Sequence, residues 1–149
     1  MRTLAIDLGT RRVGLALSDE GGRLATPYEV VQVTSTEVAA IKVLEVIARE
    51  GVQRIVLGLP LNMDDSFGPA ARQTVAWGKE IARSAHKPIV YVDERLSSFA
   101  AEQDLNERKR GGEKLTRKRR KEQLDALAAA GFLQAFLDGK LQSLDVSRA

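Results

Sequence analysis

The chain of 149 residues has no cysteine, one histidine and only 5% aromatic residues. Without cysteine it can form no disulfide bond, use no thiol nucleophile and build no thiolate metal site. Because His86 is the single imidazole, any metal site must depend on oxygen ligands. The few aromatic side chains also give little support for a surface on which single-stranded bases stack.

Long apolar runs are absent as well. Met1-Arg2 leads directly into a strand pattern without the form of a signal peptide, and no apolar run approaches the ~20 residues of a membrane helix. We therefore expect a cytoplasmic protein with no membrane segment. With 44% apolar and 29% charged residues, the chain is typical of globular proteins. We predict one domain over residues 1–138 and a flexible tail over residues 139–149.

Positive charge is concentrated in one segment. Residues 108–121 contain nine Lys or Arg and one acid, Glu113, which makes a local charge of +8 in a chain of net charge +3. Such a segment is often a solvated loop, but its density is also typical of a surface that binds a polyanion. The basic residues predicted to contact nucleic acid here are Arg117, Lys118, Arg119 and Arg120.

The hydrophobic pattern changes from strands to alternating strands and helices. Strand periodicity covers residues 3–8, 13–18 and about 23–33, with Pro27 marking an edge or a bulge. The later elements are a helix over 34–50, a strand over 54–59, a helix from 66 or 68 to 85, a strand over 88–93, a helix capped by Ser97 or Ser98, a mobile loop over 109–118 and a helix over 119–138. The core positions expected in the first helix are Val38, Ile41, Leu44, Ile47 and Ala48. This order predicts an α/β fold with three antiparallel strands, then two parallel ones.

Three carboxylates interrupt or end apolar segments. Asp7 closes the first strand, Glu94 follows the strand over 88–93, and Asp125 shares a helix face with Ala129 and Phe132. A buried carboxylate is costly unless it is neutralised, paired or bound to a metal. Because sites form at the carboxyl ends of parallel strands, we expect the three acids to converge on Mg²⁺ or Mn²⁺. Two such ions would support in-line displacement at phosphorus.

Each acid also has a structural interpretation. Asp7 before a Gly-Thr pair suits an Asx turn, and Glu94 could form an ion pair with Arg95. Asp125 could pair with Arg119 or another basic neighbour. Any one of these acids alone would indicate little, whereas three in such places favour the metal site.

Four ordered blocks of the sequence resemble the YqgF/RuvX family. They are DLGTRRVG over residues 7–14, GLPLNMD over 58–64, DERLSS over 93–98 and LDALAA over 124–129. The resemblance implies a ribonuclease H-like fold with a five-stranded mixed sheet flanked by helices, related to the resolvase RuvC. It implies a nuclease that processes the 5′ end of pre-16S ribosomal RNA or resolves Holliday junctions.

The same resemblance identifies Asp7, Glu94 and Asp125 as catalytic, metal-binding acids. RuvC-like sites commonly carry a fourth acid one turn before the last, where this chain has Glu122 at i−3. Whether Glu122 takes part, and so whether one or two ions bind, stays open at this point.

Other residues of these blocks suit phosphate binding. Arg11, Arg12 and Arg95 can hold phosphates in bidentate fashion, and Asn62 can contact a sugar or phosphate. The alternative is that these arginines only pair with nearby acids. The predicted partner is pre-rRNA or a four-way DNA junction, and symmetric cutting of a junction favours a homodimer.

Two other functions compete with a nuclease. A nucleic-acid-binding module without catalysis would work through the basic segment, although its acids would repel phosphate. An ATP-handling domain is suggested because residues 7–10 also resemble the first phosphate loop of the actin and sugar-kinase superfamily. Those proteins close two domains around the nucleotide, whereas this chain has one.

Overall fold

A computed structural model describes residues 1–95, 117–147 and 149, with residues 117–123 described as backbone only. The described elements, in chain order, are β1 (Thr3–Leu8), β2 (Arg12–Ser18), β3 (Ala25–Gln32), α1 (Thr36–Glu50), β4 (Arg54–Leu59), α2 (Pro69–Ala85), β5 (Ile89–Asp93) and α4 (Arg117–Leu137). The helix expected at Ser97 or Ser98 and the loop expected over 109–116 lie outside the described residues.

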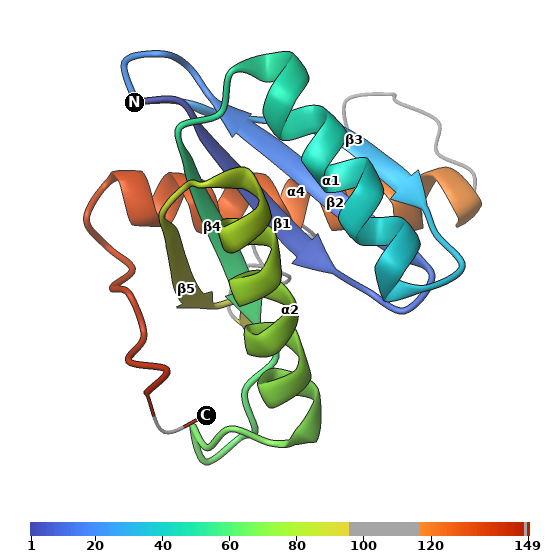
Figure 1. Cartoon of the computed structure of the whole chain (residues 1–149), viewed down its shortest axis with the longest axis vertical. Coiled ribbons are helices and arrows are strands. Elements are labelled where there is room, and N and C mark those ends of the chain that lie inside the picture. The colour runs from blue at the N-terminus through green and yellow to red at the C-terminus, as the bar shows by residue number, and fades with distance from the viewer. Residues whose placement is uncertain (96–116, 148) are drawn as a thin grey trace.

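The strands form one sheet in the order β3-β2-β1-β4-β5 (Figure 1). β1 and β2 pair antiparallel, as do β2 and β3, while β1–β4 and β4–β5 are parallel. The predicted five-stranded mixed sheet is confirmed. The register of β2 with β3 shifts between Leu15 and Ala16, which oppose Glu29 and Pro27. This is the bulge that Pro27 predicts, because proline has no N–H for a regular ladder.

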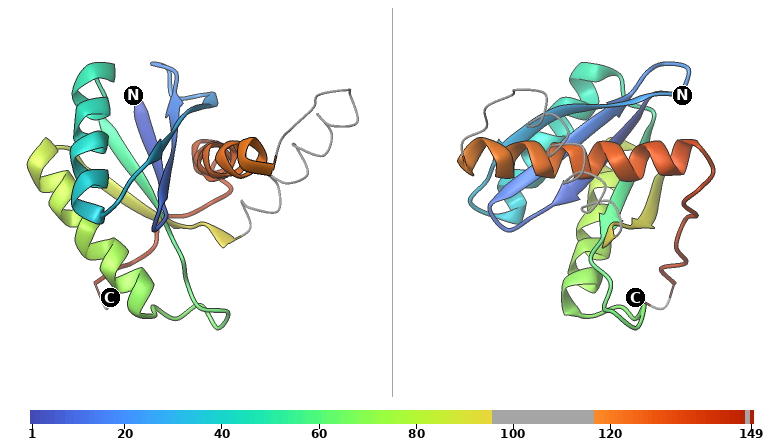
Figure 2. Two further views of the ribbon diagram at one scale, coloured as in Figure 1. Left: turned by 90° about the vertical axis from the view of Figure 1, so that its right-hand side faces the viewer. Right: turned by 180° about the vertical axis from the view of Figure 1, so that it is seen from behind.

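Helices cover both faces of the sheet (Figure 2). α1 and α2 lie on one face over a core that includes Leu4, Ile6 and Leu57. α4 lies on the other face, where Phe132 and Leu133 are fully buried against small residues of the sheet such as Ala5. Because β1 and β4 are covered on both faces, both are apolar along nearly their whole length.

The face that α1 buries matches the predicted one only in part. Ser35 caps the helix by accepting a hydrogen bond from the Val38 amide, and Gly51 ends it with a left-handed backbone at φ +62°. The buried residues are Ala39, Val43, Val46 and Ile47, so Ile47 is confirmed, and the predicted Val38 and Leu44 pack partly buried against the core. Ile41 is instead 58% exposed. The predicted stripe used repeated steps of three, and each such step turns about 60° away from the starting face in a 3.6-residue helix.

The remaining differences concern the C-terminal part. α4 begins at Arg117, so Arg117 and Lys118 belong to the helix and not to the predicted loop. After Gly139, the amide of Leu144 donates to the carbonyl of Tyr91 in β5 at 2.7 Å, and Leu144 also packs against the core. The flexibility expected for residues 139–149 stays a prediction. No helix among the described residues combines the length and apolarity needed to cross a membrane.

Candidate active site

Asp7 and Glu94 meet across the end of β4. Asp7 belongs to β1 and Glu94 directly follows β5, so β4 lies between them. Gly58 of β4 provides the space, because a β-carbon there would lie 2.9 Å from Glu94 Oε2. Sequence reasoning missed this role of Gly58, although a glycine inside an apolar strand is a signal of close approach by another group.

The two carboxyl groups perturb each other strongly. Burial raises the pKa of Asp7 to about 6, partly opposed by a hydrogen bond with Glu94. Burial first, and then repulsion by Asp7, raises the pKa of Glu94 to about 9. At neutral pH Glu94 therefore keeps its proton and Asp7 is largely ionised. Asp125 adds repulsion to both, so the third predicted acid lies within electrostatic reach of the pair.

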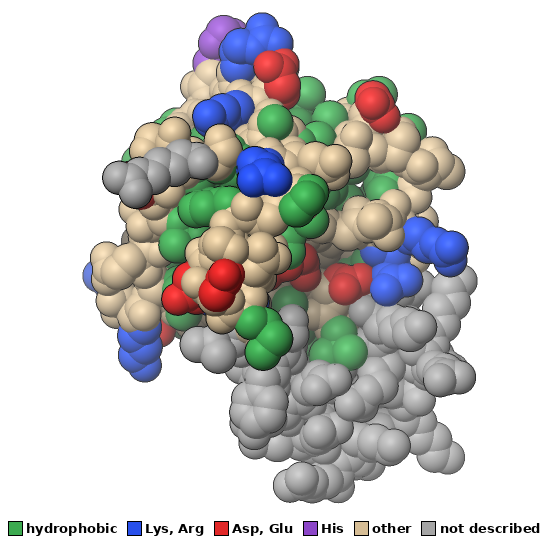
Figure 3. All heavy atoms as spheres, turned by 90° about the horizontal axis from the view of Figure 1, so that it is seen from below, with side chains coloured by type: hydrophobic (Ala, Val, Ile, Leu, Met, Phe, Trp, Pro, Cys, Tyr) green, Lys and Arg blue, Asp and Glu red, His purple; other side chains and the backbone are tan. Residues whose placement is uncertain are grey.

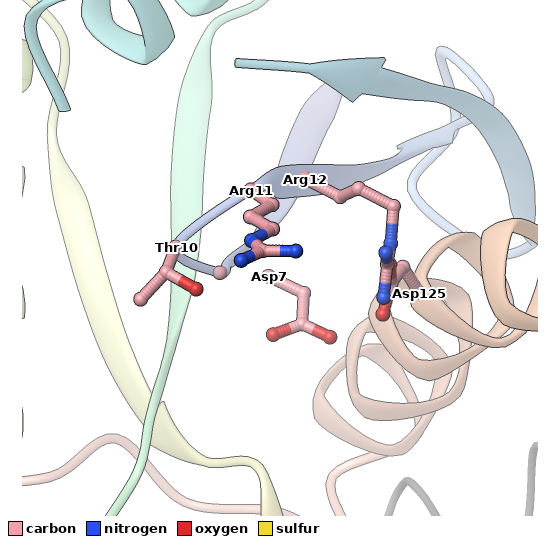
Figure 4. Close-up of a pocket in the computed structure, with 6 residues that line it drawn as sticks. Asp7, Thr10, Arg11, Arg12 and Asp125 are labelled. Carbon is pink, nitrogen blue, oxygen red and sulfur yellow. The ribbon is translucent and has the colours of Figure 1, made fainter. Parts of the chain in front are cut away.

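Asp125 reaches this region from the opposite layer. Its backbone is in contact with β2, since a β-carbon on Gly14 would lie 2.2 Å from the Asp125 carbonyl oxygen. Its carboxylate is held by Arg12, whose Nε donates to Oδ2 at 2.7 Å. Figure 4 shows the Arg12 side chain directed at Asp125, with the Asp7 carboxylate beside them.

The space between these groups is a small polar pocket. It has a volume of about 200 Å³, enough for several water molecules, and is lined by Asp7, Gly9, Thr10, Arg11, Arg12 and Asp125. Gly9 shapes its rim, because a β-carbon there would lie 2.7 Å from the Arg12 carbonyl oxygen in the tight β1–β2 turn. Seen from the side to which the parallel strands point, Asp and Glu side chains lie in a hollow with Lys or Arg beside them (Figure 3).

The acids fit an oxygen-liganded cation in part. Glu94 Oε2 is buried and has no hydrogen-bond partner within the described residues, which makes this oxygen a candidate ligand for a cation. However, no three Asp, Glu or His side chains within residues 1–95, 124–147 and 149 stand close enough together to hold one ion. The Asp125 carboxylate is turned toward Arg12 instead. The Glu122 side chain lies outside the described part.

Arg95 and Asn62 organise the loop between β4 and α2. The Arg95 guanidinium donates to Asp93 at 2.6 Å, to the Asn62 carbonyl at 2.6 Å and to Asp65. The hydrogen bonds from Arg95 hold the pKa of Asp93 below its usual range. The Asn62 side chain donates to Ser66 Oγ at 3.0 Å. Sequence reasoning missed Asp93 and Asp65 as partners of Arg95, although the Asp-Glu-Arg spacing was a signal for the first.

The other predicted phosphate-binding residues have more open surroundings. Arg11 lines the polar pocket and forms no ion pair within the described residues (Figure 4). Residues 117–120 form the start of α4, the helix that carries Asp125, and their side chains are not described. Contact of any of these residues with nucleic acid stays a prediction.

Comparison with known proteins decides the family. A sequence profile described as "RuvX: Holliday junction resolvase" matches residues 1–139. The chain belongs to the RuvX family. The Acidiphilium cryptum protein "Putative pre-16S rRNA nuclease" is 41% identical over 137 residues, or 92% of this chain and 84% of the relative. An Anaeromyxobacter relative of the same name is 41% identical over 140 residues, covering 94% of this chain and 98% of its own. The predicted resemblance is confirmed. Both the family description and the names of the relatives denote nucleases.

Solved structures support the fold. This RuvX chain superposes on Thermus thermophilus RuvC in complex with a Holliday junction with a TM-score of 0.59 at 20% identity, covering 97% of this chain and 99% of RuvC. The Fowlpox virus resolvase, also in complex with a junction, gives 0.56 at 9% identity over 93% of this chain and 98% of its own. The ribonuclease H-like fold that the RuvX resemblance implies is therefore confirmed.

Proposed function

We propose that this RuvX chain is a divalent-metal-dependent nuclease, a hydrolase that cuts phosphodiester bonds in structured nucleic acid. The observation that carries the proposal is the Asp7–Glu94 pair, in which the buried Glu94 Oε2 has no hydrogen-bond partner among the described residues. Two carboxylates in contact cannot both ionise cheaply without a cation. A site that must shed a proton in order to become fully charged is suited to a divalent cation, whose binding releases that proton.

The proposed roles follow from position. Asp7 and Glu94 would hold Mg²⁺ or Mn²⁺, with Asp125 as a third ligand once Arg12 releases it, and Glu122 is the candidate that decides between one ion and two. When bound, the cation would activate water and stabilise the leaving oxygen. Arg11 and Arg12, at the pocket, would hold substrate phosphates. Arg95 and Asn62 already form hydrogen bonds that hold the loop between β4 and α2. They would contact the substrate only through donors and acceptors that these bonds do not use.

The first substrate to test is the 5′ region of pre-16S ribosomal RNA. Relatives with about 40% identity carry that substrate in their name. A four-way DNA junction is the alternative, supported by the family description and by structural neighbours that are at most 20% identical. Either substrate would place the reaction in the cytoplasm. Symmetric junction cutting would in addition require a homodimer.

The test is a cleavage assay of the pure protein on both substrates, with Mn²⁺, with Mg²⁺ and with EDTA. Wild type should cut one of them only with metal. Asp7→Asn should lose at least ~10³-fold in rate while binding the nucleic acid as well or better, because a ligand and a negative charge are removed. Glu80→Gln, an exposed acid of α2, is the matched control and should cut normally.

Two results would contradict this proposal. Cutting in EDTA, or by pure Asp7→Asn, would remove the metal site from the mechanism. Tight metal-independent binding without cutting would favour a nucleic-acid-binding module that works without catalysis.

A further inference from the structure

The feature that carries a further inference is the ion pair between Arg12 and Asp125. The pair joins residues 113 positions apart in the chain, and its Nε–Oδ2 distance is 2.7 Å. The side chains are 31% and 28% exposed, so both can reach solvent without leaving a buried charge behind. Arg12 is at the start of β2, on the wall of the pocket that Asp7 also lines.

The backbone around this pair leaves little freedom. Because Gly14 brings the Asp125 carbonyl against β2, the backbone of Asp125 is held in place, and its carboxylate can move only by rotation of the side chain. The ion pair can therefore open by rotation of the Arg12 and Asp125 side chains, without any movement of α4. Asp125 is free for a cation only when Arg12 has turned to another anion.

A substrate brings such an anion. Phosphate oxygens suit the planar guanidinium fork at least as well as a carboxylate does, and they allow two parallel hydrogen bonds. Once Arg12 has turned away, the negative charges of Asp125 and Asp7 lie side by side, and a divalent cation stabilises them. Both exchanges occur in one pocket and each makes the other more favourable.

We propose that Arg12 couples nucleic-acid binding to metal binding: paired with Asp125 it withholds this carboxylate, and a substrate phosphate that takes up the guanidinium releases it. This inference rests on the proposed metal-dependent nuclease and deepens it. The acid site is completed only when substrate is present, which limits unspecific cutting. Thermodynamic reciprocity requires that metal also tightens substrate binding by the same factor.

The first experiment is calorimetric titration of Mn²⁺ into metal-free protein without nucleic acid. Arg12→Gln should bind Mn²⁺ about 5- to 20-fold more tightly than wild type, because Asp125 becomes available. Arg11→Gln removes the same charge from the same pocket without freeing Asp125, and it controls for general electrostatics. Arg12→Lys, which keeps the charge, should stay close to wild type.

The direction of the change separates this role from a structural one. A merely structural ion pair, when broken, would loosen the site and weaken Mn²⁺ binding, whereas the proposal requires a gain in affinity. Thermal unfolding of each variant confirms that it is folded before titration. If Arg12→Gln is unstable, the wild-type titrations with and without nucleic acid in the second experiment below still decide.

The second experiment repeats the Mn²⁺ titration with a saturating pre-16S 5′ RNA fragment, and separately with a four-way DNA junction, each checked as uncut on a gel afterwards. Mn²⁺ affinity of the wild type should rise about 5- to 20-fold with the nucleic acid, and that of Arg12→Gln should not. Wild-type Mn²⁺ binding that neither nucleic acid nor Arg12→Gln changes would overturn the coupling while the nuclease stands. No Mn²⁺ binding by any variant, with or without nucleic acid, would overturn both.

Discussion

The carbonyl oxygen of Asp125 occupies the place where a side chain on Gly14 would begin. A β-carbon on Gly14 would lie 2.2 Å from that oxygen and 3.0 Å from the Ala126 nitrogen, both of them backbone atoms. Neither atom can move without shifting α4, so this contact sets the height of the helix above the sheet. Gly14 therefore determines where the Asp125 carboxylate can stand relative to Asp7.

Gly14→Ala should be strongly destabilising for this reason. Forcing a methyl group into the α4 contact should cost about 1–3 kcal/mol and lower the melting temperature by about 3–10 °C. Thermal and urea denaturation measure the effect. Gly21→Ala is the control, because the nearest atom to its β-carbon would be 3.7 Å away. Equal stability of the two variants would show that α4 is not held by this contact.

The metal-free protein should lose stability as the pH rises. The folded-state pKa of Glu94, about 9, lies above its ordinary value of 4.5, so the folded protein keeps a proton that the unfolded chain releases. This contribution is complete below about pH 4.5 and is lost progressively up to about pH 9. Asp7 adds a smaller effect of the same sign, with a pKa of about 6.

Glu94→Gln should therefore stabilise the metal-free protein at pH 8, by roughly 1–4 kcal/mol, even though it removes a proposed ligand. Urea midpoints in EDTA at pH 5, 7 and 9 measure this, with Glu80→Gln as the control for an exposed acid. Added Mn²⁺ should stabilise wild type more at pH 8 than at pH 5.5. The same pH profile for wild type and Glu94→Gln would contradict the raised pKa of Glu94 in its pair with Asp7.

Arg95→Gln should loosen the loop between β4 and α2. Arg95 joins this loop, through Asn62 and Asp65, to Asp93 at the end of β5. Without it, amide hydrogen exchange over residues 61–67 should accelerate while exchange in the strands changes little. Arg83→Gln breaks an exposed pair with Glu80 within α2 and is the control. Unchanged exchange in the loop would mean that Arg95 is available for phosphate instead.

The basic start of α4 should account for much of the salt dependence of binding. Neutralising residues 117–120 should weaken binding to nucleic acid and reduce the slope of log K against log salt by up to about 3–4. Fluorescence anisotropy at several salt concentrations measures that slope. The control changes four other basic residues to Gln: Lys42, Lys79, Arg83 and Lys140. Equal slopes for both quadruple variants would mean that residues 117–120 form a solvated helix end without specific phosphate contacts.

Strand ends and caps could be predicted because they depend on local chemistry. The Asp7 and Glu94 positions follow from apolar runs that stop, and Ser35 and Gly51 bound α1 as their residue types require. The buried face of α1 could not be read in the same way. Its apolar residues occur on more than one side of the helix, and only the sheet beneath selects among them.

The arrangement of the site depends on contacts between distant parts of the chain. In the sequence, a nearby basic residue such as Arg119 is a possible ion-pair partner of Asp125. In the structure the partner is Arg12, 113 residues away. Likewise the role of Gly58 depends on Glu94 crossing from the next strand. Residue types and element ends predicted which groups matter, but pairing across elements had to come from the fold.

The segment after α4 has a consequence for handling the protein. β5 is an edge strand of the sheet. The Leu144 N–H donates a hydrogen bond to the Tyr91 carbonyl of β5, and Leu144 and Val146 pack against apolar residues of the core. A chain shortened after Gly139 would present that carbonyl and those apolar atoms to other molecules. Open strand edges recruit further strands. Self-association and precipitation would then follow from a truncation that leaves every proposed ligand in place.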